Sequence, residues 1–296
     1  MCTVTFIARQ RGYCLGMNRD EKLTRPAGLP PKKKTVNGYT VLCPSERGGG
    51  TWIALNDQGV AFALINWYSI TTRVGGKAVS RGEVVNSVSA VRSPDFADTA
   101  LAKLPLDQIN PFRLIGIFPA TGKISEWRWD LKQLVRKNHR WKAQQWISSG
   151  FDEPTAQRVR SKTFQQAQRQ KSAGSLDWLR RLHRSHSPQS GPFSTCTHRA
   201  DAATVSYTEV TVSPHENVMR YWPVAPCQCF MSRVHLRISR KEIANNARRR
   251  PLQLNLKRKP RRRPKRSSSG QAKTQAAAPT KREERKSAPW RRSSTG

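Results

Sequence analysis

The sequence predicts a layered α+β domain followed by a long basic tail. Strand-like and helix-like segments alternate in blocks (strands, helices, strands, helices, strands) and not as a regular βαβ repeat, which indicates layers of each kind. Residues 60–65 are apolar throughout, a pattern typical of a strand covered on both faces. The basic tail is predicted from the excess of Lys and Arg over Asp and Glu at the end of the chain. From residue 231 onward 22 Lys and Arg stand against 3 Asp and Glu, a net +19 of the chain's +35.

The first elements are predicted strands. Residues 3–8 alternate in polarity and predict a strand that begins beside Cys2, and a turn at 10–12 returns the chain through residues 13–17. The Pro- and Lys-rich residues 26–34 are expected to form a loop. Further strands are predicted at 39–43 and at 51–55 and 60–65, which form a hairpin because Asn-Asp-Gln-Gly lies between them.

Two helices are predicted next. Ser80 and Glu83 have the spacing of a capping box, which places the N-cap at Ser80. Ser93-Pro94 starts a second helix that runs through Leu104, with proline at its first position.

The second half of the domain is predicted in the same way. The expected elements are a hairpin at 112–118 and 123–129, two or three helices within 131–185, and closing strands at 194–197, 204–212 and 218–222. The folded domain is therefore expected to span 1–232. Residues 233–296 form blocks of Lys and Arg that cannot bury enough apolar surface, so they are expected to be disordered.

Several functional classes are excluded by composition. The start of the chain has no basic and apolar signal sequence, and no run reaches the roughly 20 apolar residues of a membrane helix. The six scattered cysteines indicate free thiols. We therefore expect a cytoplasmic protein without a membrane span.

Cys2 is the first candidate for chemistry. A residue as small as cysteine permits removal of Met1, which leaves a free α-amine beside the thiol. That amine, with a pKa of about 7.7–8.0, can take the proton of its own side chain. The alternative is that Cys2 is a small buried residue at the start of an edge strand.

Three further candidates complete a site. In the run Asn18-Arg19-Asp20-Glu21, a hairpin length beyond Cys2, Arg19 is expected to lower the pKa of the thiol and Asp20 to hold the α-amine. Asn66, at the end of an apolar strand, can aim its amide at an oxyanion. The alternatives are a solvated ion pair at a turn and an asparagine placed for turn geometry.

No metal site and no cofactor are expected. Cys227-Gln228-Cys229 and Cys196-Thr197-His198 lack the two-residue gap usual between zinc ligands, and His183 and His186 are near only in sequence. Gly48-Gly49-Gly50 is not followed by Lys-Ser or Lys-Thr, so a phosphate loop is not predicted.

Several motifs together resemble the NRDE family, to which the transport and Golgi organization 2 proteins belong. They are Met1-Cys2-Thr3-Val4, Asn18 to Glu21, Arg25-Pro26, and Gly48 to Asn56, with a weaker likeness from Gly191 to Tyr207. The resemblance covers about residues 1–226. It implies a four-layer α/β/β/α sandwich of the N-terminal-nucleophile type, distantly similar to choloylglycine and penicillin V acylases.

The resemblance also implies roles. Cys2 matches the nucleophile, Arg19 the arginine and Asn66 the oxyanion amide of those acylases, whereas Asp20 is an approximate match because it adjoins Arg19. Two functions follow: an amidohydrolase acting on a small-molecule amide, or a non-catalytic carrier of haem or a lipid-like ligand. A third partner, nucleic acid bound without sequence preference, rests on the charge of the tail.

Overall fold

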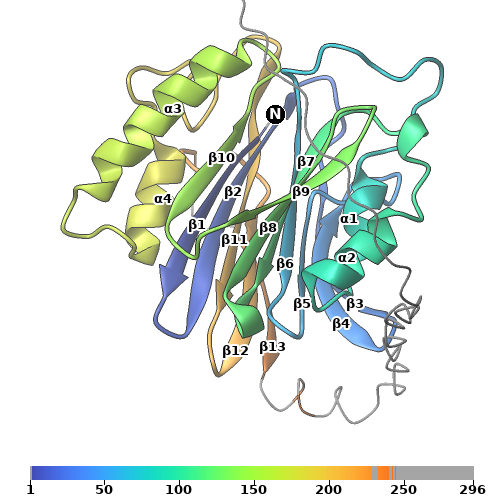
Figure 1. Ribbon diagram of the computed structural model, residues 1–296. Coiled ribbons are helices and arrows are strands. Elements are labelled where there is room, and N and C mark those ends of the chain that lie inside the picture. The colour runs from blue at the N-terminus through green and yellow to red at the C-terminus, as the bar shows by residue number, and fades with distance from the viewer. Residues whose placement is uncertain (1, 229–232, 240–241, 243, 245–296) are drawn as a thin grey trace, which may run out of the picture. The chain divides into compact units, whose positions relative to one another are not determined.

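The computed structural model describes residues 2–228, 233–239, 242 and 244. Two antiparallel sheets pack face to face, with helices on their outer faces (Figure 1). The predicted α/β/β/α layering is therefore confirmed, and its elements bring distant parts of the chain together.

The first sheet joins the chain start to its last described strand. β1 and β2 form a hairpin, and β2 pairs on its other side with β11. In spatial order the strands are β10 (Gln144–Ser148), β1 (Cys2–Arg9), β2 (Gly12–Lys22), β11 (Ala202–Val212), β12 (Glu216–Trp222) and β13 (Val234–Ser239).

The second sheet follows the order of the sequence. The predicted turn between β5 and β6 is confirmed, because the Asn56 amide donates to the Val60 carbonyl and Gly59 has a positive φ of 72°. In spatial order the strands are β3 (Leu29–Val36), β4 (Tyr39–Ser45), β5 (Ile53–Asn56), β6 (Ala61–Asn66), β7 (Phe112–Phe118), β8 (Lys123–Trp129) and β9 (Leu134–His139).

The main core lies between the two sheets. Alternate residues of each strand point into it, as the two-residue period of a strand requires. From the first sheet come residues such as Val4, Phe6 and Leu15, and from the second Ile53 and Ile65. Cys2 belongs to the same core cluster at the end of β1.

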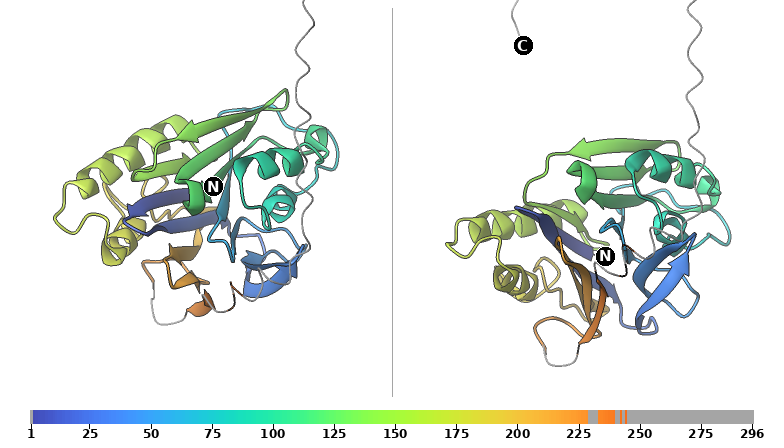
Figure 2. Two further views of the ribbon diagram at one scale, coloured as in Figure 1. Left: turned by 60° about the horizontal axis from the view of Figure 1, so that its bottom comes forward. Right: turned by 90° about the horizontal axis from the view of Figure 1, so that it is seen from below.

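The helices cover the outer faces. α3 (Glu153–Gln168) and α4 (Leu176–Arg184) lie on the first sheet, and α1 (Gly82–Val88) and α2 (Pro94–Leu101) on the second (Figure 2). Single 3₁₀ turns occupy Leu106–Gln108 and Pro119–Thr121. Ser93 caps α2 through the Phe96 amide, as predicted, but α1 begins after Arg81, so Ser80 is not its N-cap.

Four strands differ from expectation. β3 was expected as a loop, β9 and β10 as helix, and β13 lies beyond the predicted domain end at residue 232. These are the four edge strands of the two sheets in the described part of the chain. β3 and β9 are rich in Pro, Lys or Arg, which suit a strand paired on one side only and hide the apolar pattern.

Two other expectations are revised. Residues 194–197, expected as a strand, form an irregular loop. β13 pairs along its whole length with β12 and buries Ile238 completely, so the fold extends past residue 232. The rest of the predicted tail, from residue 245, lies outside the described residues. None of the helices described has the length and apolar composition needed to cross a bilayer.

Candidate active site

The run Asn18 to Glu21 lies in strand β2, and its four side chains alternate between the faces of the sheet. The Arg19 guanidinium lies over the Trp52 ring of the second sheet, 4.5 Å from its centre. Asn18 instead contacts His183 of α4, on the outer face. Neighbouring residues of this motif therefore contact different layers, the second sheet on one face and helix α4 on the other.

Cys2 lies directly across from Arg19. The strand register pairs Cys2 with Arg19 on β2 and with Ser148 on β10. Because directly opposed residues share a face of an antiparallel sheet, the thiol lies on the same side as the guanidinium. Cys2 is 7% exposed.

The pKa of the Cys2 thiol is raised above its ordinary value. Burial is the main cause, and the Asp20 carboxylate adds to it, while Arg19 and a backbone hydrogen bond from Asp20 oppose it. Arg19 lowers this pKa as expected, but desolvation by burial outweighs the guanidinium, so the net pKa is raised. The thiol needs a base to become a nucleophile near neutral pH.

Arg19 is held in a network of charges. Its Nη2 lies 2.8 Å from Glu46 and 3.3 Å from Glu21, and Arg25 lies 2.8 Å and 3.0 Å from the same two carboxylates. Burial alone would raise the pKa of Glu21, but the Lys22 amide and the two arginines lower it. Glu21 is therefore a carboxylate that fixes Arg19 in place.

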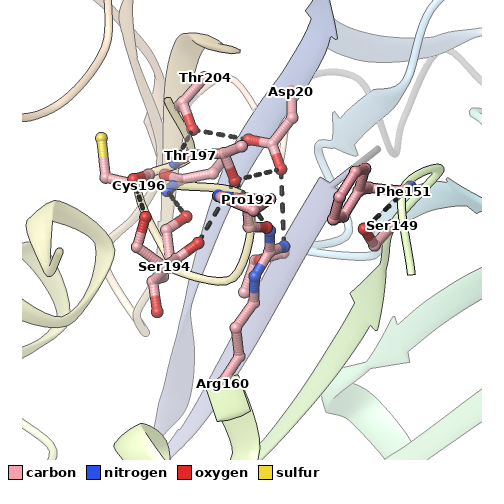
Figure 3. Close-up of polar contacts among 12 residues, drawn as sticks. Asp20, Ser149, Phe151, Arg160, Pro192, Ser194, Cys196, Thr197 and Thr204 are labelled. Carbon is pink, nitrogen blue, oxygen red and sulfur yellow. Dashed lines mark hydrogen bonds and ion pairs between the residues drawn. The ribbon is translucent and has the colours of Figure 1, made fainter. Parts of the chain in front are cut away.

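Asp20 points to the opposite face (Figure 3). Its carboxylate accepts hydrogen bonds from Thr204 at 2.6 Å and Thr197 at 3.2 Å and lies 3.6 Å from the Arg160 guanidinium. Arg160 also donates to Thr3 at 2.9 Å. The carboxylate is thus fixed beside the start of β1, on the side away from Arg19.

Asn66 lies at the last position of β6 and is half-buried. Its Nδ2 donates to the Tyr68 hydroxyl at 2.8 Å. An amide nitrogen carries two N–H bonds, so this contact leaves a second one for a ligand.

All four predicted residues border one cavity of about 350 Å³. Most of its walls are polar or charged, and they come from both sheets and from the segment before α1. The lining residues are Cys2, Arg19, Asp20, Glu21, Arg25, Glu46, Thr51, Trp52, Leu64, Asn66, Ala78, Val79, Ser80, Arg81, Gly82 and Asn110. The structure brings the predicted set together, while the catalytic role of each member stays a prediction.

Two residues of the site were missed from the sequence. Glu46 directly follows β4, where a polar residue is unremarkable. Arg160 carried a usable signal: it shares a helix face with Ala156 and Phe164, four residues to either side, and all three are buried. A charged residue in the middle of an apolar helix face indicates a buried partner.

Comparison with known protein families gives a partial match. The family model Transport and Golgi organisation 2 matches residues 1–126. No curated protein matches the chain.

Solved structures give a distant likeness. Penicillin V acylase from Agrobacterium tumefaciens is 10% identical with a TM-score of 0.47, over 82% of this chain and 88% of that one. A mutant conjugated bile acid hydrolase from Clostridium perfringens is 10% identical with a TM-score of 0.48, over 82% of this chain and 93% of that one.

Proposed function

We propose that this chain, whose residues 1–126 match the family model Transport and Golgi organisation 2, is an N-terminal cysteine amidohydrolase. Its substrate is a small molecule with a C–N amide bond. One observation supports this most: Cys2 opposes Arg19 in the strand register, and both border the same cavity as Asn66.

The proposed reaction begins with removal of Met1, which frees the α-amine of Cys2. The amine takes the thiol proton, and the sulfur attacks the amide carbonyl to form a tetrahedral oxyanion. The C–N bond then breaks, the ammonium returns its proton to the leaving amine, and a thioester remains on Cys2. Water activated by the same amine hydrolyses the thioester and restores the thiol.

The neighbouring residues have separate roles in this proposal. The free N–H of Asn66 donates to the oxyanion. Arg19 stabilises the thiolate and so opposes the rise in pKa that burial causes, since its guanidinium is the cation directly across the strand pair from Cys2. Asp20, held at the end of β2 by Thr204 and Arg160, stabilises the ammonium form of the α-amine.

The test combines the mature N-terminus with turnover. We expect intact mass spectrometry to show the chain without Met1, and a panel of N-acyl p-nitroanilides to yield a substrate that acylates Cys2. Cys2→Ala is expected to abolish hydrolysis and acylation and to keep the melting temperature within a few degrees, because a thiol beside a cavity leaves little new void. Cys43→Ala, in the other core, is the matched control and keeps activity.

Retention of Met1 would contradict the proposal, as would hydrolysis that survives Cys2→Ala. Stoichiometric haem or lipid in the purified chain, without turnover of any amide, would favour the carrier function.

A further inference from the structure

Four side chains that can ligate a metal meet at one place beside the first sheet. His186 follows α4, Cys196 and His198 lie in the loop before β11, and Cys227 follows β12. Their ligand atoms all lie within 4.8 Å of one another. They come from three separate segments between regular elements. The first and the last, His186 and Cys227, are 41 positions apart in the sequence.

The separations fit a tetrahedral ion. Cys196 Sγ lies 3.5 Å from Cys227 Sγ, and His198 Nε2 lies 3.6 Å and 3.3 Å from these two sulfurs. With Zn–S of about 2.3 Å and Zn–N of about 2.05 Å, a regular tetrahedron places two sulfurs about 3.8 Å apart and a sulfur and a nitrogen about 3.5 Å apart. The observed values differ from these by a few tenths of an ångström.

His186 adds an independent observation. Its Nε2 is buried and has no hydrogen-bond partner among the described residues. Its ring packs against that of His198 with 5.0 Å between centres. A buried polar nitrogen without a partner is costly, and a bound cation would supply the partner.

Backbone hydrogen bonds hold the loop in this form. The Cys196 amide donates to the Ser185 carbonyl at 3.0 Å, and the His198 amide donates to the Gly191 carbonyl at 3.2 Å. The Cys196 carbonyl accepts from the Ser194 hydroxyl at 2.5 Å. These contacts place the two ligands without help from an ion.

We propose that His186, Cys196, His198 and Cys227 form a closed, structural zinc site. Two thiolates and two imidazoles favour zinc over the hard cations that prefer oxygen ligands. Four protein ligands leave no position for a substrate, so the ion would have a structural role.

The expectation of no metal site rested on two observations: Cys227-Gln228-Cys229 and Cys196-Thr197-His198 lack the usual two-residue gap, and His183 and His186 are near them only in sequence. The fold nevertheless brings His186 beside Cys196, His198 and Cys227, which sequence spacing does not reveal. Cys229 lies outside the described residues.

The proposed ion also bears on Asp20. Thr197 lies between two of the ligands, and its hydroxyl donates to the Asp20 carboxylate. A zinc ion would therefore stabilise the loop that fixes Asp20. This inference does not depend on the amidohydrolase reaction.

The experiment measures metal in the full-length chain. We expect inductively coupled plasma mass spectrometry to find one zinc per chain after purification without chelators. The metal-free chain titrated with Co²⁺ alone is expected to show the intense visible bands of a tetrahedral thiolate complex. Cys227→Ser and His198→Asn are expected to weaken zinc binding by more than the roughly 10–100-fold that loss of an outer-shell contact causes.

Three controls sharpen the result. Cys43→Ala and the exposed His215→Asn should keep one zinc per chain. Cys229→Ser tests whether that neighbour replaces Cys227, and it too should keep the ion. If a ligand variant fails to fold, the Co²⁺ titration of the unaltered chain still decides. Absence of tetrahedral bands, or a Cys196–Cys227 disulfide detected by mass, would overturn the proposal.

Discussion

Asn18 shows why an amide stands at the head of the motif. Its Nδ2 donates to the carbonyls of His183 and Thr195 at 2.9 and 2.8 Å, and its Oδ1 lies 3.0 Å from His183 Nδ1. The residue is fully buried. Only a side chain with both donors and an acceptor satisfies all three partners.

Asn18→Asp removes both donors at this position. We expect a loss of about 3 kcal/mol of unfolding free energy, because two buried carbonyls lose their partner and face a carboxyl group instead. The measurement is urea unfolding. Asn37→Asp, at an exposed turn position, should change stability by less than about 0.5 kcal/mol. Equal effects of the two changes would refute this account of Asn18.

His183 has a consequence for pH dependence. Burial lowers its pKa to about 3, and its ring bonds Asn18 and Thr5 at 3.0 Å each. The ordinary pKa in an unfolded chain is about 6.5, so between these values the unfolded chain takes up a proton that the folded chain does not. Stability from this residue is therefore complete above pH 6.5 and falls as pH decreases toward 3.

The expected fall is roughly 1.4 kcal/mol per pH unit in that window. Unfolding free energies measured from pH 7 to pH 4 test it, and His183→Gln should remove this part of the slope. NMR of the imidazole gives a second readout: the His183 ring should stay neutral at pH 5. A ring that titrates near 6.5 in the folded protein would contradict the burial argument.

At the scale of elements, the edge strands limit what could be predicted from the sequence. The interior strands were predicted because their apolar alternation or continuous apolar run records burial on one or both faces. β3 contains Pro30, Pro31 and three lysines, and four of the six residues of β9 are exposed, so neither strand has an apolar pattern in its sequence.

The site residues could likewise be predicted only in part. Cys2 and Asn66 lie at strand ends and Arg19 lies near the end of β2, positions that local pattern can locate, whereas Glu46, Arg160 and the metal ligands meet only through tertiary folding.

The predicted domain end at residue 232 left out β13, and the contribution of this strand to stability can be tested. A chain ending at residue 232 lacks the strand that covers β12 and buries Ile238. We expect it to lose at least about 2 kcal/mol of unfolding free energy, since burial of one isoleucine contributes about 1.5–3 kcal/mol. A chain ending at residue 244 should unfold at the midpoint of the full chain. Equal stability of the two truncated chains would show that β13 contributes nothing.

At the scale of the whole molecule, charge is divided between the fold and the tail. Residues 245–296 contain 18 Lys and Arg against 2 Asp and Glu, a net charge of +16. Such a density predicts attraction to polyanions without sequence preference. We expect the full chain to bind double-stranded DNA with an affinity that falls steeply between 50 and 200 mM salt.

The chain ending at residue 244 is the matched control for this prediction. It keeps the sheets and the cavity, and it should lose most of the binding and most of the salt dependence. Fluorescence anisotropy with a labelled duplex measures both. Tight binding by the shortened chain would assign the affinity to the folded part instead.

The alternation of faces along β2 makes this strand intolerant of insertions and deletions. Inserting one residue between Gly12 and Met17 would turn Arg19 toward α4 and Asn18 toward the cavity, because each position would exchange faces. No compensating substitution at a single position could restore both sets of contacts. In related sequences, length changes in this hairpin are therefore expected only at the turn around residues 10 and 11, where they leave the pairing of Cys2 with Arg19 unchanged.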